Sequence, residues 1–228
     1  MIVRASVGAA QVVLVALAFT PQASVAGSNA DSTCPYSAAT VVAESAVDKR
    51  DACAGAEDAI KFLEKLGLQT SEPPSILVTT KIPPEAGPTA AGCFIEQRRL
   101  IYMLPYAQFR KLNTWFGVPI DRRMYRSLAT HESAHALAGC NFSVPRPTIQ
   151  AKEYIAYVAM FSTMDPALRT RALRATPGSG FASEDRITQL LHMFDPMRFG
   201  AEAYRHFVKP DVGPAFVKAI LQGKALLD

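Results

Sequence analysis

Apolar positions in the first half of the chain change their spacing near residue 70. From Ala38 to Leu66 they recur at helical intervals, and the Cys53-Ala54-Gly55 stretch predicts a break between two helices. Beyond it the chain carries three short apolar runs, at residues 75–80, 93–95 and 99–104. The polar residues 96–98 between the last two runs indicate a hairpin. We therefore expect a small antiparallel sheet in this half.

From residue 105 onward the pattern is almost entirely helical. Asp121 is a favourable N-cap for a long helix that we expect to end near Gly139. Asp165-Pro166 and Asp195-Pro196 each combine a capping side chain with a proline in the first turn, which is typical of helix starts. The other predicted helices cover residues 106–115, 148–163, 166–175, 183–194, 197–208 and 214–226.

These elements predict an α+β fold with one domain, residues 27–228. A lobe of helices and sheet, residues 27–120, would precede a mostly helical lobe, residues 121–228. Hydrophobic residues make up 49% of the chain and charged residues 19%, which allows a packed core and excludes a disordered chain. The net charge of +4 is too small to indicate nucleic-acid binding.

The first 26 residues have the form of a secretory signal peptide. Arg4 precedes an apolar stretch from Ala5 to Phe19, and Ser24-Val25-Ala26 places small residues at the −3 and −1 positions of a cleavage site. The apolar run is shorter than the about 20 residues that a transmembrane helix needs. We therefore expect cleavage after Ala26 and a secreted or periplasmic protein with no stable membrane anchor.

The cysteines agree with export. All four follow the expected cleavage site and none forms a C-x-x-C pair, so in an oxidising compartment they indicate two disulfides. Four cysteines allow three pairings. Of these we favour Cys34–Cys53 as a local link and Cys93–Cys140 as a long-range one.

Residues 131–135, in the middle of the long predicted helix, carry the chemistry. His131 and His135 are four residues apart, which stacks them on one helix face where both imidazoles can bind one ion. Glu132 lies about 100° around the helix from His131, where it would flank the ion and act as a general base. The alternative is a pair of ordinary helix histidines. That is disfavoured because two of only four histidines fall at this spacing around a glutamate.

Glu153, 18 residues after His135, is a candidate third ligand. Its helical neighbours at positions 149, 156, 157 and 160 are apolar, and a carboxylate on an apolar face is costly unless it is paired. A metal ion would satisfy it, and so would an arginine.

The segment His131-Glu132-Ser133-Ala134-His135 resembles the HExxH motif of zinc metallopeptidases of the zincin class. A sheet before the motif helix and helices after it are also similar. Metzincins would have a glycine and a third histidine where this chain has Ala138 and Asn141. In gluzincins the third ligand is a glutamate on the next helix, the place that Glu153 occupies. The resemblance is close over about 30 residues that hold the motif and Glu153.

This resemblance implies a zincin-like fold with zinc bound by His131, His135 and Glu153, one zinc position open, and Glu132 as the general base. The substrate would be a peptide or a protein. Similar enzymes often add a tyrosine or histidine that holds the oxyanion. The candidates are Tyr157, His192, Tyr204 and His206, and their spacing selects none of them.

The sequence thus predicts an exported zinc-dependent hydrolase, a metallopeptidase in which zinc activates water and Glu132 accepts its proton. The alternative is a non-catalytic exported helical binding or interaction protein whose metal site is structural or absent. The substrate and the oligomeric state are left open.

Overall fold

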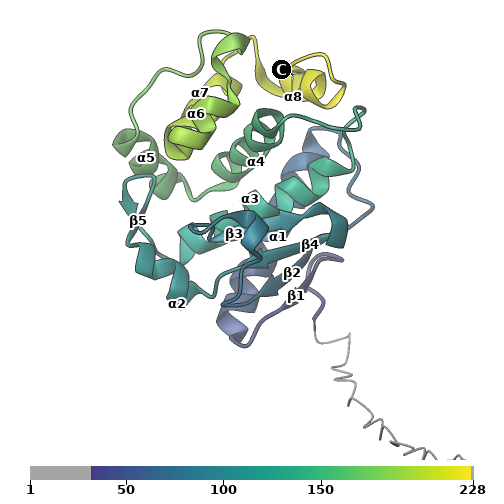
Figure 1. Ribbon diagram of the computed structural model, residues 1–228, viewed down its shortest axis with the longest axis vertical. Coiled ribbons are helices and arrows are strands. Elements are labelled where there is room, and N and C mark those ends of the chain that lie inside the picture. The colour runs from purple at the N-terminus through teal and green to yellow at the C-terminus, as the bar shows by residue number, and fades with distance from the viewer. Residues whose placement is uncertain (1–31, 227–228) are drawn as a thin grey trace, which may run out of the picture.

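The computed structural model describes residues 32–226, which form an α+β fold (Figure 1). The predicted signal peptide, residues 1–26, lies outside the described residues. Within that range there are eight α-helices, a four-stranded mixed sheet and a two-stranded sheet. Helices α6 (Gln189–Phe194), α7 (Pro196–Phe207) and α8 (Gly213–Leu221) lie at the opposite end of the molecule from strands β1 (Thr40–Val42) and β2 (Ser75–Val78).

The larger sheet has the strand order β1-β2-β4-β3. Its strands are β1 (Thr40–Val42), β2 (Ser75–Val78), β3 (Gly92–Ile95) and β4 (Leu100–Met103). The β3–β4 hairpin is antiparallel, as predicted. The β1–β2 and β2–β4 pairs are parallel, so the expectation of an antiparallel sheet is wrong for them. Parallel strands need a crossover connection, and the helix between β1 and β2 supplies one.

Burial alternates along β1, β2 and β4, because helices cover one face of the sheet. Val41, Ile76, Ile101 and Met103 are buried on that face. The residues between them are more exposed, as Val42 is at 56%. This alternation is the period-2 signal expected of a sheet with one solvated face.

Helix α1 (Ala46–Lys65) is continuous, so the predicted break at residues 53–55 is wrong. Gly55 lies where α1 crosses α3 (Arg122–Gly139). A Cβ on Gly55 would lie 2.4 Å from the Arg126 carbonyl oxygen and 2.6 Å from Cβ of Ala129. The glycine therefore permits close helix packing and does not end the helix.

Helix α3 begins where the sequence predicts. The Asp121 side chain accepts a hydrogen bond from the Met124 N–H at 2.9 Å, which caps the helix. Arg122 forms ion pairs with Asp48 and Asp51 of α1, at 2.5 and 3.0 Å. Helix α3 is thus fixed against α1 from its first turn.

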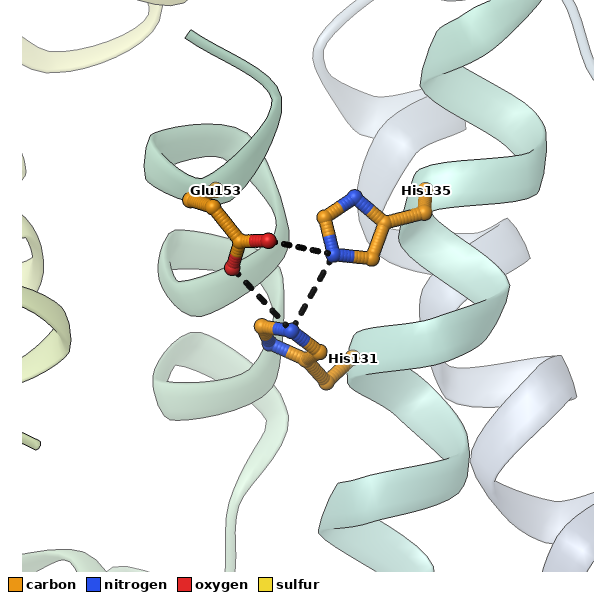
Figure 2. A group of neighbouring side chains, drawn as sticks. All are labelled: His131, His135 and Glu153. Atoms are coloured by element: carbon orange, nitrogen blue, oxygen red, sulfur yellow. Dashed lines mark hydrogen bonds and ion pairs between the residues drawn. The ribbon is translucent and has the colours of Figure 1, made fainter. Parts of the chain in front are cut away.

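The helices that follow α3 lie on the side of it away from the larger sheet, with α4 (Ile149–Thr163) packed beside α3 (Figures 1 and 2). Asp165 and Asp195 cap α5 and α7 as predicted. The predicted helix at 106–115 is cut short at Phe109, and that at 183–194 is reduced to α6 and a preceding 3-10 turn. The other elements are α2 (Tyr106–Phe109), α5 (Pro166–Ala175), α6 (Gln189–Phe194), α7 (Pro196–Phe207), α8 (Gly213–Leu221), β5 (Thr114–Trp115) and β6 (Val118–Pro119). None of the helices within residues 32–226 is long and apolar enough to span a bilayer.

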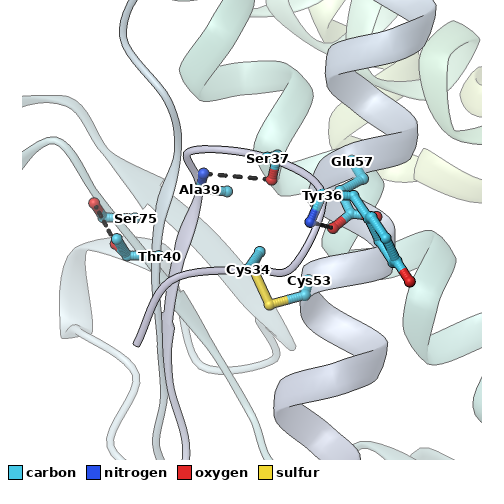
Figure 3. Close-up of a disulfide and its surroundings, with 8 residues drawn as sticks. All are labelled: Cys34, Tyr36, Ser37, Ala39, Thr40, Cys53, Glu57 and Ser75. Carbon is cyan, nitrogen blue, oxygen red and sulfur yellow. Dashed lines mark hydrogen bonds between the residues drawn. A yellow bond between two sulfur atoms is a disulfide. The ribbon is translucent and has the colours of Figure 1, made fainter. Parts of the chain in front are cut away.

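The predicted disulfide between Cys34 and Cys53 is present, with the two Cα atoms 5.4 Å apart (Figure 3). It links the segment before β1 to the middle of α1. Beside it, the Tyr36 N–H donates to the Glu57 carboxylate at 3.2 Å. A loop of this length stabilises a fold by roughly 3 kcal/mol in the chain-entropy view.

The predicted Cys93–Cys140 disulfide is wrong, because both residues are free thiols. Gly92 and Phe94 point at α3, so Cys93 between them points to the other face of the sheet. Cys140, by contrast, directly follows the end of α3. Burial raises the pKa of the Cys93 thiol to about 11, and the charges of Glu132 and Glu85 add to this.

We expect one disulfide and two free thiols in protein purified from an oxidising compartment. Alkylation of the unfolded, non-reduced chain should label Cys93 and Cys140 and leave Cys34 and Cys53 unmodified until reductant is added. Peptide mass spectrometry measures this. A chain in which Cys93 and Cys140 escape labelling would contradict the structure.

We expect Gly55→Ala to lower the free energy of unfolding by about 1–3 kcal/mol, because the added methyl group overlaps the α3 backbone. Gly139→Ala is the matched control, since its Cβ would meet its nearest neighbour, a Phe94 ring carbon, at an ordinary 4.0 Å. Urea denaturation of both variants provides the comparison. Equal midpoints would show that the α1–α3 crossing is looser than described.

Candidate metal centre

Helices α3 and α4 bring three potential metal ligands together (Figure 2). His131 and His135, one turn apart on α3, have their Nε2 atoms 3.1 Å apart. Glu153 projects from α4, with Oε2 3.4 Å from His131 Nε2 and Oε1 3.5 Å from His135 Nε2. Glu153 pairs only with histidines among the described residues, so the alternative of an arginine partner does not hold.

The spacing of these atoms fits a metal ion. Tetrahedral ligands at about 2.0–2.1 Å from zinc lie about 3.3–3.4 Å from one another, close to the three distances found here. Two imidazole nitrogens 3.1 Å apart can share only one proton, whereas an ion accepts a lone pair from each. His131, His135 and Glu153 therefore form a group that could hold a metal ion.

Burial and mutual attraction set the charges of the three groups. Burial lowers the pKa of His135 to about 4, against the opposing charge of Glu153, so its nitrogen is free to bind a metal near neutral pH. Burial disfavours the Glu153 carboxylate, but attraction to His135 and hydrogen bonds from His131 and His192 hold its pKa well below the usual range. For His131, burial is likewise outweighed by the Glu153 interaction, and its pKa is raised.

Glu132 lies beside the ligands and is 5% exposed. Burial raises the pKa of its carboxyl group to about 7; the charge of His131 opposes the rise and that of Glu153 adds to it. No hydrogen bond to this carboxylate is found within residues 32–226. A carboxylate with a pKa in this range is suited to accept and release a proton at neutral pH.

Of the tyrosine and histidine candidates, the structure brings His192 and Tyr157 to the cluster. His192 projects from α6, with Nε2 3.3 Å from Glu153 Oε2. Its side chain is 20% exposed and that of Glu153 is 18% exposed, so the cluster is partly open to solvent. Sequence spacing could not single it out, because α6 is brought to α4 only by the packing of the helices that follow α3.

Tyr157 also lies against the site, one turn beyond Glu153. Its ring centroid is 4.4 Å from that of His131. A Cβ on Gly200 of α7 would lie only 2.5 Å from the Tyr157 ring, so the glycine leaves room for it. Burial, together with the charges of Glu153 and Glu132, raises the pKa of Tyr157 well above its usual value, which keeps the phenol neutral.

The other two candidates lie elsewhere. Tyr204 stacks on Phe161 with the ring centroids 5.5 Å apart. His206 Nδ1 hydrogen-bonds the Tyr154 hydroxyl at 2.9 Å. Both side chains contribute to the packing of α7 against α4 and not to the metal centre.

We expect His192→Ala to weaken zinc binding by about 10- to 100-fold, because a side chain that hydrogen-bonds a ligand carboxylate also orients it. Met193→Ala is the control, since this side chain of the same helix is 67% exposed. Competition with a chromophoric chelator measures both affinities. If both variants bind zinc as tightly as the parent chain, His192 does not support Glu153.

Comparison with curated proteins and with solved structures finds no match to this chain. A family model matches residues 39–228, a region that includes His131, Glu132, His135, Glu153 and His192. The family is described as one of unknown function, DUF6639, and the chain belongs to it.

Proposed function

We propose that this protein is a zinc-dependent hydrolase of the zincin type and acts as a metallopeptidase. His131, His135 and Glu153 would hold the zinc, and Glu132 would be the general base. The observation that carries the proposal is the convergence of three ligand atoms beside a buried carboxylate with a pKa of about 7. Perturbed carboxylates of this kind are typical of catalytic sites.

The ligand set favours zinc. Two imidazoles and one carboxylate are a common protein contribution to catalytic zinc, which keeps a further position open. Zinc bound there would polarise a substrate carbonyl group and lower the pKa of water toward about 7.

The chain's own residues would handle the proton and the substrate. Glu132 would accept a proton from the attacking water and pass it to the leaving amine, for which a pKa near 7 is suited. Tyr157 remains a neutral phenol, so it can donate a hydrogen bond to the substrate carbonyl oxygen. His192 contacts Glu153 through Nε2, at 3.3 Å, and would hold this ligand in place.

The sheet offers a place for an extended peptide. Strand β3 is at the edge of the sheet and its first residue, Gly92, lies against Glu132. An unpaired strand edge can bind a peptide by adding it as a further strand. The order of the elements along the chain, with the sheet first and then α3 and α4, also supports the zincin resemblance.

We propose that the enzyme works outside the cytoplasm after residues 1–26 are removed. The Cys34–Cys53 disulfide supports this location, because such bonds persist in oxidising compartments.

We expect Glu132→Gln to retain one zinc per chain and to lose hydrolysis by roughly 10²–10⁴-fold, the usual contribution of a general base. His135→Ala should lose both zinc and activity, because it removes a ligand. Elemental analysis and a fluorogenic peptide library measure the two properties. Glu96→Gln, whose side chain is 63% exposed, is the control and should change neither.

Two results would contradict the proposal. Stoichiometric zinc without hydrolysis of any library peptide would favour the exported binding protein with a structural metal. A chain without zinc, whose thermal stability does not respond to chelator, would exclude the metal site altogether.

A further inference from the structure

Strand β3 begins directly over the Glu132 side chain. A Cβ on Gly92 would lie 2.9 Å from both Cγ and Oε1 of Glu132 and 3.1 Å from its Cδ. Carbon atoms in favourable contact are about 3.5–4.0 Å apart, so a side chain at this position would overlap the carboxylate group. Only the hydrogen atom of a glycine fits on the Cα atom of residue 92.

The backbone conformation does not require a glycine here. The φ angle of Gly92 lies outside the left-handed region, in contrast to that of Gly87 at +87°. Alanine could therefore adopt the same conformation without strain. The space over Glu132 is the remaining reason for a glycine.

The strand cannot retreat from a larger residue. Gly92 pairs with Met103 of β4, and the neighbouring Ala91 carbonyl accepts a hydrogen bond from the Leu104 N–H at 2.8 Å. Met103 is fully buried, and its own carbonyl is bonded to the Thr79 N–H at 2.8 Å. A Cβ at position 92 would consequently displace the flexible Glu132 side chain and leave the sheet in place.

The ligands would not be moved in the same way. The nearest atoms to a Cβ on Gly92 all belong to Glu132, and none belongs to His131, His135 or Glu153. A substitution at this position therefore separates the placement of the general base from the binding of the metal.

We propose that Gly92 is a positioning residue for the general base: because it has no side chain, it leaves the space in which the Glu132 carboxylate lies beside the three ligands. This role rests on the proposed function. It gives the edge strand a second task, besides pairing with a peptide, in setting the geometry of the reaction.

The test compares Gly92→Ala with Gly139→Ala, which adds the same methyl group to the same β3–α3 interface with ordinary contacts. Gly92→Ala should keep one zinc per chain and a KM within about twofold of the parent, while kcat falls by about 10- to 100-fold, as expected for a misplaced reacting group. Gly139→Ala should leave zinc content, KM and kcat unchanged. Loss of zinc in Gly92→Ala, or an unchanged kcat, would overturn the proposal.

A second measurement does not depend on activity. In a chain that carries Glu132→Ala, the overlap is absent. Adding Gly92→Ala to that chain should raise the thermal unfolding midpoint by about 1–4 °C, because alanine restricts the unfolded chain. With Glu132 present the rise should be smaller or reversed. Equal effects in the two backgrounds would show that positions 92 and 132 do not interact, which overturns the proposal.

The proposed function and the role of Gly92 can be overturned by different results. A parent chain that hydrolyses no peptide overturns the proposed function and the role of Gly92 together. A parent chain that does hydrolyse peptides, with Gly92→Ala equally active, overturns only the role of Gly92.

Discussion

One carboxylate and two imidazoles lie together, largely buried, between α3 and α4, and each would be costly there alone. Glu153 keeps its charge because histidines surround it, and His135 gives up its proton because burial does not allow a second positive charge. This arrangement of charges is kept only if α3 and α4 stay in register. A shift of either helix by one residue would turn a ligand away from the shared point by about 100°.

Helix α3 is held in its place by α1. Gly55 lets α1 approach α3 closely, and the Arg122–Asp48 ion pair holds the beginning of α3. Exposed ion pairs contribute little. Asp48, however, is 4% exposed and also accepts the Tyr106 N–H at 3.1 Å, so it cannot separate from Arg122 without leaving a buried charge unpaired. These contacts fix the position of α3, which carries His131 and His135.

The features that the sequence predicts correctly are those set by local spacing. The spacing of four positions from His131 to His135, and an apolar face around Glu153, suffice to indicate one cluster on two helices. Gly55 misleads because glycine weakens an isolated helix, whereas here a second helix passes over it. The predicted Cys93–Cys140 disulfide is wrong because the face of the sheet to which Cys93 points depends on the pairing of β3 with β4. His192 and the parallel strand pairs likewise depend on contacts between distant segments.

These two kinds of residue divide the work of the centre. The atoms that could hold a metal come from neighbouring helices, so a local pattern encodes them. The residues that would position Glu132 and Glu153 come from elsewhere: Gly92 from the edge of the sheet, and His192 from α6, a helix with no fully buried residue. Segments with few buried contacts open at low free energy. The placement of Glu132 and the support of Glu153 are therefore controlled by different parts of the fold, and one can change while the other is kept.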